Sequence, residues 1–115
     1  MNENTIKTII DIAEDLGWTV SHDKENNTWG FSIYTPEGMD GDMTIDGGSL
    51  EELKHSLYEY WTDYDVSQET YYWLDSSGHG TNGAPYDMKD VYEDIEWFSD
   101  KIKELGGKIN EIEEE

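Results

Sequence analysis

The sequence contains no cysteine, which excludes disulfide bonds and thiolate metal ligands from the 115-residue chain. It also contains no arginine, so that seven lysines are its only strongly basic side chains. Binding to nucleic acid or to an anionic membrane requires a cationic surface, and seven lysines among 28 carboxylates cannot supply one. We therefore expect no direct contact with nucleic acid and no association with a membrane.

Long apolar runs are missing as well. No segment approaches the ~18 consecutive apolar residues of a membrane-spanning helix. The N-terminal stretch lacks the basic flank and the continuous apolar run of a signal peptide. Together these absences predict a cytoplasmic protein.

The carboxylates give the chain a net charge of −21. Repulsion among so many like charges opposes the compact state, so the charge needs an explanation beyond solubility. A compact chain of this length has a radius of gyration of about 13 Å, and hence a diameter near ~35 Å. Duplex DNA carries roughly 20 phosphate charges over that length. The total charge therefore resembles that of an equally long piece of DNA, and a strongly basic protein is the expected partner.

The first half of the chain predicts one helix followed by three short strands. The helix runs from about Thr5 to Leu16, with Asn4 as its N-cap and Gly17 just after its end. Apolar and polar residues then alternate with the period of a half-buried strand. Turn residues separate the strands, which are expected near residues 18–20, 29–33 and 43–45.

The second half predicts three helices. Ser49 and Glu52 form a capping box for a helix that reaches about residue 64. Ser67 is the expected N-cap of a short helix, and a glycine-rich loop follows at 76–85. Asp87 is the expected N-cap of a long helix that ends at the glycines 106–107.

This order of elements predicts an α+β fold. An N-terminal helix precedes a three-stranded antiparallel β-meander, and three further helices pack on one face of the sheet. We expect residues 1–107 to form a single domain and residues 108–115 to be an acidic, frayed tail. The aromatic residues, 13% of the chain, provide core area that the low apolar content of 35% would not.

Two motifs resemble ligand-binding loops but lack the required context. Residues 78–83 match the letters of a dinucleotide-binding loop, but no strand is predicted before them. Residues 40–51 resemble a calcium loop, although Ile45 occupies the position that needs glycine. We expect no cofactor and no dedicated metal site. His79, with Asp75 or Asp87, is the best candidate for metal or acid–base chemistry.

Most aromatic residues of the helices fall on core-facing stripes, but Tyr58, Tyr72, Trp73 and Trp97 do not. Tyr72 and Trp73 point away from the side that Tyr71 shares with Leu74, so they either pack between the layers or reach a partner. Trp97 projects from the acidic face of the last helix, where it fits an interface anchor. Alternatively, the tail or the partner of a homodimer covers Trp97.

Three stretches carry a resemblance, namely IAEDLGWTV, WGFSIYTPEG and GHGTNGAPY. Together they resemble small acidic proteins of unknown function that are carried on mobile elements of low-GC bacteria. The abundance of Lys, Asn, Ile and Tyr and the lack of Arg agree with such a genome. The resemblance implies an inhibitor of host defence and does not identify its target.

Three functional hypotheses follow. The first is a non-enzymatic DNA-mimic inhibitor of a nucleic-acid-binding host enzyme, such as a restriction enzyme or a CRISPR effector. The second is an immunity protein that caps a basic nuclease toxin. The third is a metal-dependent or acid–base enzyme that uses His79. The candidate partner contacts are Asp11, Asp15, Glu52, Glu59, Asp63, Asp90, Glu93, Asp94, Trp97, Tyr72 and Trp73.

Overall fold

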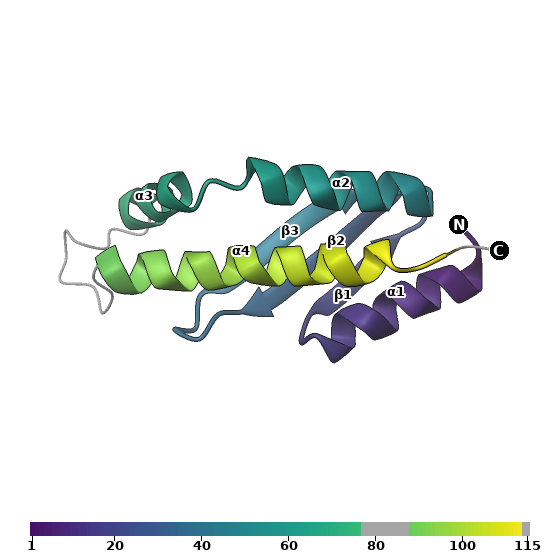
Figure 1. The fold of residues 1–115 in the computed structure, drawn as a ribbon, viewed down its shortest axis with the longest axis horizontal. Helices are drawn as coiled ribbons and strands as arrows, with labels where there is room; N and C mark the ends of the chain where they lie inside the picture. The colour runs from purple at the N-terminus through teal and green to yellow at the C-terminus, as the bar shows by residue number, and fades with distance from the viewer. Residues whose placement is uncertain (77–87, 114–115) are drawn as a thin grey trace.

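A computed structural model describes residues 1–76 and 88–113 of the chain. Helices and strands follow one another in the predicted order (Figure 1). The elements are α1 (Glu3–Asp15), β1 (Thr19–Asp23), β2 (Thr28–Tyr34), β3 (Asp40–Asp46), α2 (Leu50–Asp63), α3 (Val66–Ser76) and α4 (Met88–Asn110). The predicted α+β fold is therefore confirmed. Within the described residues, every helix is too short or too polar to cross a membrane.

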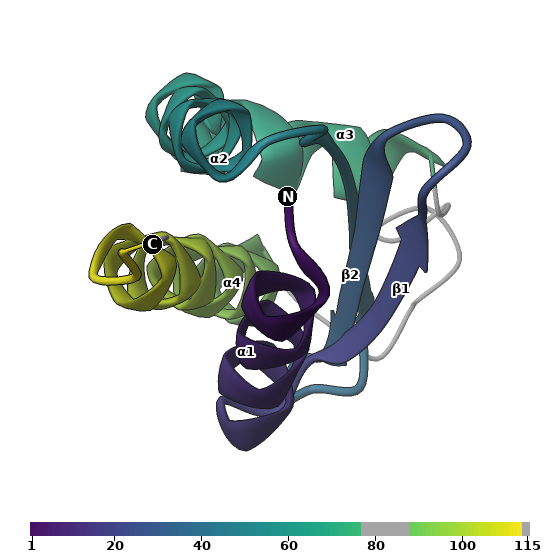
Figure 2. The same cartoon turned by 90° about the vertical axis from the view of Figure 1, so that its right-hand side faces the viewer.

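The strands form one antiparallel sheet in the order β1-β2-β3. The helices α1, α2 and α4 cover one face of this sheet and leave the other face open (Figure 2). Both views place α4 between α1 and α2, and α3 extends past α2 at one end of the molecule. The result is an elongated two-layer domain of 53 × 25 × 23 Å.

Alternation along the strands explains why only one face is covered. Trp29 and Phe31 on β2, and Met43 and Ile45 on β3, are buried against the helices, whereas the residues between them face outward. Trp18, just before β1, packs edge-on against Phe31 with a ring-centroid separation of 6.2 Å. These side chains form the central part of the core, because aromatic rings bury large areas per residue.

The helix α4 supplies the second half of the core. Six of its apolar residues recur at intervals of three or four and are all buried: Val91, Ile95, Phe98, Ile102, Leu105 and Ile109. Ile109 lies beyond the glycines at which the sequence predicted the helix to end. The helix continues through Gly106 and Gly107 to Asn110, so the predicted end is wrong.

Tertiary packing explains why the two glycines do not stop α4. A helical glycine costs about 1 kcal/mol relative to alanine, and burying an isoleucine outweighs that cost. Ile109 is fully buried, and Lys54 of α2 donates a hydrogen bond of 2.7 Å to the carbonyl oxygen of Ile112. Residues 108–110 therefore continue α4, where the sequence predicted a frayed tail. Glu114 and Glu115 lie outside the described residues.

The helix caps confirm some predictions and correct others. Ser49 caps α2 as predicted, although Glu52 accepts from the backbone N–H of Gly48 instead of that of Ser49. Gly17 follows α1 with a φ of +98°, a left-handed conformation that favours glycine. Asn2, and not the predicted Asn4, caps α1 by accepting from Thr5 N–H at 2.8 Å.

The helix α3 also begins at a different cap from the predicted one. The side chain of Asp65, and not that of Ser67, accepts a hydrogen bond of 3.1 Å from the N–H of Gln68. The helix begins at Val66, two residues earlier than a helix capped by Ser67 would, and Asp65 therefore occupies the N-cap position. The predicted cap of α4, Asp87, lies outside the described residues.

A close contact between Gly41 of β3 and α4 provides a test of this packing. A Cβ atom on Gly41 would lie 2.4 Å from the ring of Phe98 and 3.1 Å from the carbonyl oxygen of Ile33. We expect Gly41→Ala to destabilise the protein by about 1–3 kcal/mol, because the ring or the strand must move. Denaturant unfolding would measure this loss as a lower midpoint.

The matched control is Gly107→Ala. A Cβ atom on Gly107 would have no neighbour within 4 Å, so alanine should stabilise α4 by about 0.5–1 kcal/mol. A Gly41→Ala variant as stable as the wild type would contradict the described contact between β3 and Phe98.

Candidate binding surface

The open face of the sheet is acidic. We call it the outer sheet face and define it by the outward residues of the three strands. Four of them are aspartates and none is a lysine. The face consists of Thr19, Ser21, Asp23, Thr28, Gly30, Ser32, Tyr34, Asp40, Asp42, Thr44 and Asp46.

The strand register separates these aspartates from one another. Asp40, Asp42 and Asp46 lie opposite Tyr34, Ser32 and Thr28, respectively. No carboxylate on this face therefore lies directly opposite another. Like charges directly opposite each other on neighbouring strands would destabilise the sheet. Along β3, alternate residues are spaced by roughly 7 Å, which sets the separation between the backbone positions of Asp40 and Asp42.

Asp23, on β1, has a structural role in the turn that follows. Its carboxylate accepts hydrogen bonds from the backbone and side chain of Asn26 and from the backbone of Glu25. These bonds, led by the one from the Asn26 side chain, lower the pKa of Asp23. By contrast, none of the described ion pairs involves Asp40, Asp42 or Asp46.

Acidic residues continue from β3 along α2 and into α3, and β3 and α2 pack against each other (Figure 1). Between residues 40 and 69 the sequence contains nine carboxylates and one lysine, Lys54. That lysine side chain is only 17% exposed. We call this set the acidic band: Asp40, Asp42, Asp46, Glu51, Glu52, Glu59, Asp63, Asp65 and Glu69.

Most of the lysines lie outside the acidic band. Four of the seven belong to α4. Lys101 donates a hydrogen bond of 2.9 Å to the carbonyl oxygen of Leu16, at the end of α1, and also pairs with Glu104 at 2.7 Å. Because most lysines interact with residues outside the acidic band, most of its carboxylates take part in no described ion pair with a lysine.

The structure brings only some of the predicted contacts together. Glu52, Glu59 and Asp63 are exposed on α2 and belong to the acidic band. Asp11 and Asp15 are exposed on α1, which lies on the other side of α4 (Figure 2). On α4 itself, Asp90 is half-buried and Glu93 is exposed. The predicted carboxylates therefore do not form one continuous surface.

Asp94 is buried, so the predicted partner contact at this residue is replaced by a structural role. Its carboxylate accepts a hydrogen bond from the hydroxyl of Thr35 and one of 3.2 Å from the N–H of Glu37. The Thr35 hydroxyl oxygen accepts in turn from the N–H of Met39 at 2.8 Å. Asp94 therefore fixes the turn between β2 and β3 to α4.

Two of the three predicted contact rings are largely covered by the chain itself. Trp97 is half-buried against the main core, and the ammonium of Lys101 lies 5.8 Å from its ring centroid. Trp73 is half-buried against a smaller cluster that includes Met39 and Val91. Tyr72, 55% exposed, is the only one of the three that is open to a partner.

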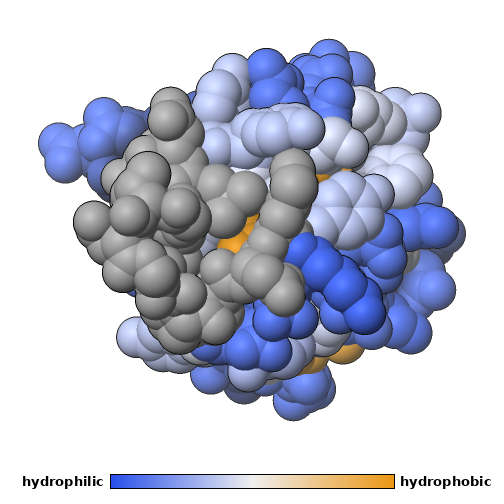
Figure 3. Space-filling view, turned by 90° about the vertical axis from the view of Figure 1, so that its left-hand side faces the viewer, coloured by the Kyte–Doolittle hydropathy of each residue, from blue (hydrophilic) through white to orange (hydrophobic). Residues whose placement is uncertain are grey.

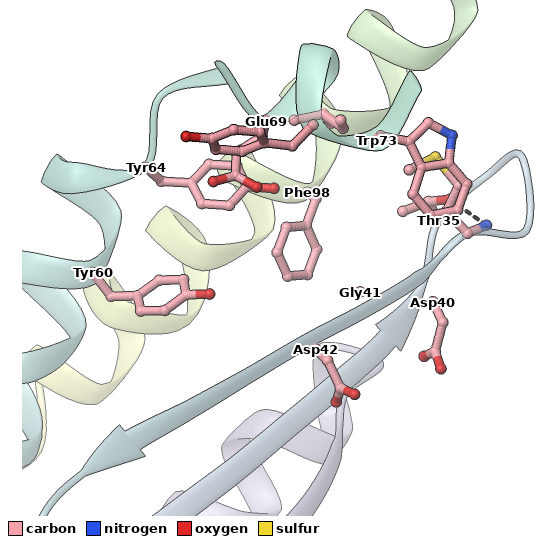
Figure 4. A pocket seen from close by; sticks show the side chains of 12 residues that line it. Thr35, Asp40, Gly41, Asp42, Tyr60, Tyr64, Glu69, Trp73 and Phe98 are labelled. Carbon is pink, nitrogen blue, oxygen red and sulfur yellow. Dashed lines mark hydrogen bonds between the residues drawn. The ribbon is translucent and has the colours of Figure 1, made fainter. Parts of the chain in front are cut away.

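A cavity of about 320 Å³ opens between β3, α2, α3 and α4 at one end of the acidic band (Figure 4). We call it the tyrosine cavity. Its described lining contains five aromatic side chains, three carboxylates and no lysine. The lining residues are Thr35, Met39, Asp40, Gly41, Asp42, Tyr60, Tyr64, Glu69, Tyr72, Trp73, Ile95 and Phe98.

The surface around this end of the molecule is mainly hydrophilic where the chain is described (Figure 3). A second groove, of about 450 Å³, lies between α2 and α4 and contains Trp61. There the chain supplies its own cation, since the ammonium of Lys103 lies 5.5 Å from the Trp61 ring centroid. The two hollows therefore differ in whether a basic side chain already faces the aromatic rings.

The enzyme hypothesis gains no support from the described residues. Among residues 1–76 and 88–113, no group of three or more His, Cys, Asp or Glu side chains could hold a metal ion. His79, Asp87 and the glycine-rich motif at 78–83 lie outside the described residues, and the side chain of Asp75 is not described. Catalysis by these residues stays a prediction.

Comparison with known proteins does not assign the chain to a family. No protein-family model, no curated protein and no solved structure matches it. The resemblance to small acidic proteins of mobile elements therefore stays a prediction, and the functional inference depends on the geometry of the acidic band.

Sequence reasoning missed the outer sheet face. Asp40, Asp42 and Asp46 were considered only as parts of a calcium loop, although they alternate with Gly41, Met43 and Ile45. The signal was present in the period of two, because alternation places all three aspartates on one face of a strand. The tyrosine cavity had no such signal, since it is formed by residues from separate elements.

The role of Asp94 can be separated from that of its exposed neighbour. We expect Asp94→Ala to cost about 1–3 kcal/mol of stability, because it leaves the buried Thr35 hydroxyl without its acceptor. Glu93→Ala should change stability by less than about 0.5 kcal/mol, since its ion pair with Lys89 is exposed and 3.9 Å long. Thermal or denaturant unfolding of both variants would measure the difference, and equal stabilities would contradict the structural role.

Proposed function

We propose that the protein is a non-enzymatic acidic inhibitor that occupies the nucleic-acid-binding surface of a basic enzyme in the cytoplasm. The observation that supports this most is the acidic band, in which nine carboxylates of β3, α2, α3 and the α3 N-cap are accompanied by one lysine. A basic surface that binds phosphates would attract these carboxylates, and this attraction would accelerate the encounter.

The net charge per unit length of the molecule supports mimicry of nucleic acid, although it is further from the value of duplex DNA than the sequence suggested. Of the net charge of −21, three charges belong to Asp87, Glu114 and Glu115, outside the described residues. The remaining 18 are distributed over 53 Å, or about one charge per 3 Å. Duplex DNA carries one phosphate charge per ~1.7 Å of its axis, and each single strand carries one phosphate charge per ~3.4 Å. The protein falls between these values because the domain is longer than the ~35 Å expected of a compact sphere.

The way the carboxylates are held also supports binding. Asp40, Asp42 and Asp46 are short side chains on a strand that is hydrogen-bonded to β2 along its length. Glu52 and Glu59 project from a helix whose start is capped by Ser49. Backbone order of this kind reduces the entropy that a partner must remove on binding. The acidic band is therefore a preorganised array of negative charge.

The proposal predicts a salt-dependent partner that duplex DNA displaces. The immobilised protein would be incubated with a bacterial lysate at low salt and then eluted either with salt or with duplex DNA. We expect both treatments to release the same basic, nucleic-acid-binding enzyme, because both screen or replace the carboxylates. A partner that resists salt, or one that DNA does not displace, would contradict mimicry.

Matched variants assign the effect to the acidic band. The triple variant Asp40→Asn, Asp42→Asn, Asp46→Asn should weaken binding to the purified partner by about tenfold or more, if each lost pair contributes ~0.5–1 kcal/mol. The control, Glu93→Gln, Glu96→Gln, Glu104→Gln, removes three charges from exposed positions on α4 and should have a much smaller effect. Equal losses would indicate that net charge, and not this surface, determines binding. A partner that is a nuclease with a blocked active site and a free DNA-binding surface would favour the immunity hypothesis instead.

A further inference from the structure

The tyrosine cavity combines aromatic faces with negative charge. Tyr60 and Tyr64 are stacked with a ring-centroid separation of 6.2 Å, and the ring of Phe98 lies 5.6 Å from that of Tyr64. Figure 4 shows these three side chains converging on the cavity from α2, its C-terminal end and α4. The hydroxyl of Tyr72 accepts a hydrogen bond of 2.8 Å from Gln68, which restrains its ring. The cavity is therefore lined by aromatic rings that contact one another or a neighbouring side chain.

Carboxylates lie close enough to these rings to affect their ionisation. Burial raises the pKa of Tyr60 and of Tyr64 above the ordinary value, and the nearby Glu69 carboxylate raises both further. Asp42 also contributes to the raised pKa of Tyr60. Figure 4 shows Glu69 next to Tyr64, whereas Asp40 and Asp42 point away from the rings toward the outer sheet face. Negative charge is thus present both beside the cavity and on the adjoining strand.

No basic side chain of the described chain compensates this charge. The lining contains no lysine, and Glu69 takes part in none of the described ion pairs. The groove between α2 and α4 shows the opposite case, because Lys103 faces Trp61 there. Aromatic faces and carboxylates both attract cations, so the tyrosine cavity has the chemistry of a cation site whose cation comes from another molecule.

We propose that the tyrosine cavity receives an arginine side chain of the basic partner, an inference that rests on the proposed function. The guanidinium stacks against the tyrosine rings and forms hydrogen bonds with the carboxylate of Glu69. The volume of about 320 Å³ is enough for one such side chain and lies at the lower end of the range for ligand sites. Asp40 and Asp42, at the edge of the cavity, face the basic surface around that arginine.

Arginine fits this site better than lysine for two reasons. Its planar guanidinium can stack on an aromatic face while it donates two parallel hydrogen bonds to one carboxylate. An ammonium is a compact and strongly hydrated charge, and it loses more water on entering an apolar cavity. The site therefore selects the side chain that most often reads phosphates and bases in nucleic-acid-binding proteins.

Three capped tripeptides test the inference without the partner. Each has glycine on both sides of a central residue, which is arginine, lysine or citrulline, the neutral analogue of arginine. They are titrated into the full chain while the ring signals of Tyr60, Tyr64 and Phe98 are followed by NMR. We expect millimolar binding of the arginine peptide, at least threefold weaker binding of the lysine peptide, and no saturable binding of the citrulline peptide.

Two variants locate the site. Glu69→Gln should reduce the affinity for the arginine peptide about tenfold, the effect of losing one charge-assisted hydrogen bond. Glu111→Gln removes the same charge at the opposite end of α4, away from α3, and should leave the affinity unchanged (Figure 1). Tyr60→Leu should reduce the affinity about threefold by removing one aromatic face. Circular dichroism would verify that each variant is folded.

The inference is overturned if the arginine peptide does not bind, if citrulline binds equally well, or if Glu69→Gln and Glu111→Gln have the same effect. Failure of the proposed function gives a different result. In that case the peptide binds in the tyrosine cavity, but lysate yields no partner that DNA displaces. If the partner is captured and Glu69→Gln binds it as tightly as the wild type, the acidic band functions without the cavity and the inference fails alone.

Discussion

The packing of one apolar sheet face against three helices must overcome the repulsion of a chain whose net charge is −21. Trp18, Phe31 and Phe98 meet at the centre of this layer, where Trp18 contacts both other rings. Because burial on that face supplies the main stabilising free energy, every strand has to present its apolar residues to the same side. The outer sheet face is left for polar residues, and so the core determines where the charge can accumulate.

Two of the seven lysines join elements of the fold. Lys101 links α4 to the C-terminal end of α1, where a positive charge also interacts favourably with the helix dipole. Lys54 links α2 to the backbone after α4. Both side chains are less than one-fifth exposed, so they add little to the outward charge. A chain with so few lysines that places two of them in this way leaves most of the acidic band uncompensated.

The sequence predicted those features that local patterns determine. Alternation around Trp29 and Phe31 identified β2, and Gly17 and Ser49 marked a helix end and a helix start correctly. The sequence pattern wrongly predicted Asn4 and Ser67 as N-caps in place of Asn2 and Asp65. These neighbouring residues have similar capping chemistry, and only tertiary contacts decide which of them caps the helix. The sequence pattern also could not show that Asp94 would meet Thr35, 59 residues away in the chain. The cavity residues come from four elements, so their meeting depends on the packing of those elements and on no single stretch of sequence.

The aspartates of β3 also affect how the sheet behaves at high concentration. Among the described strands, β3 pairs only with β2, so its other edge has no strand partner. Unpaired edges can add strands from other molecules and so start aggregation, and natural proteins often counter this with charged residues. A second copy that approached β3 edge to edge would bring Asp40, Asp42 and Asp46 close to like charges of its own. The same residues that are proposed to attract a basic partner thereby keep copies of the protein from joining their sheets.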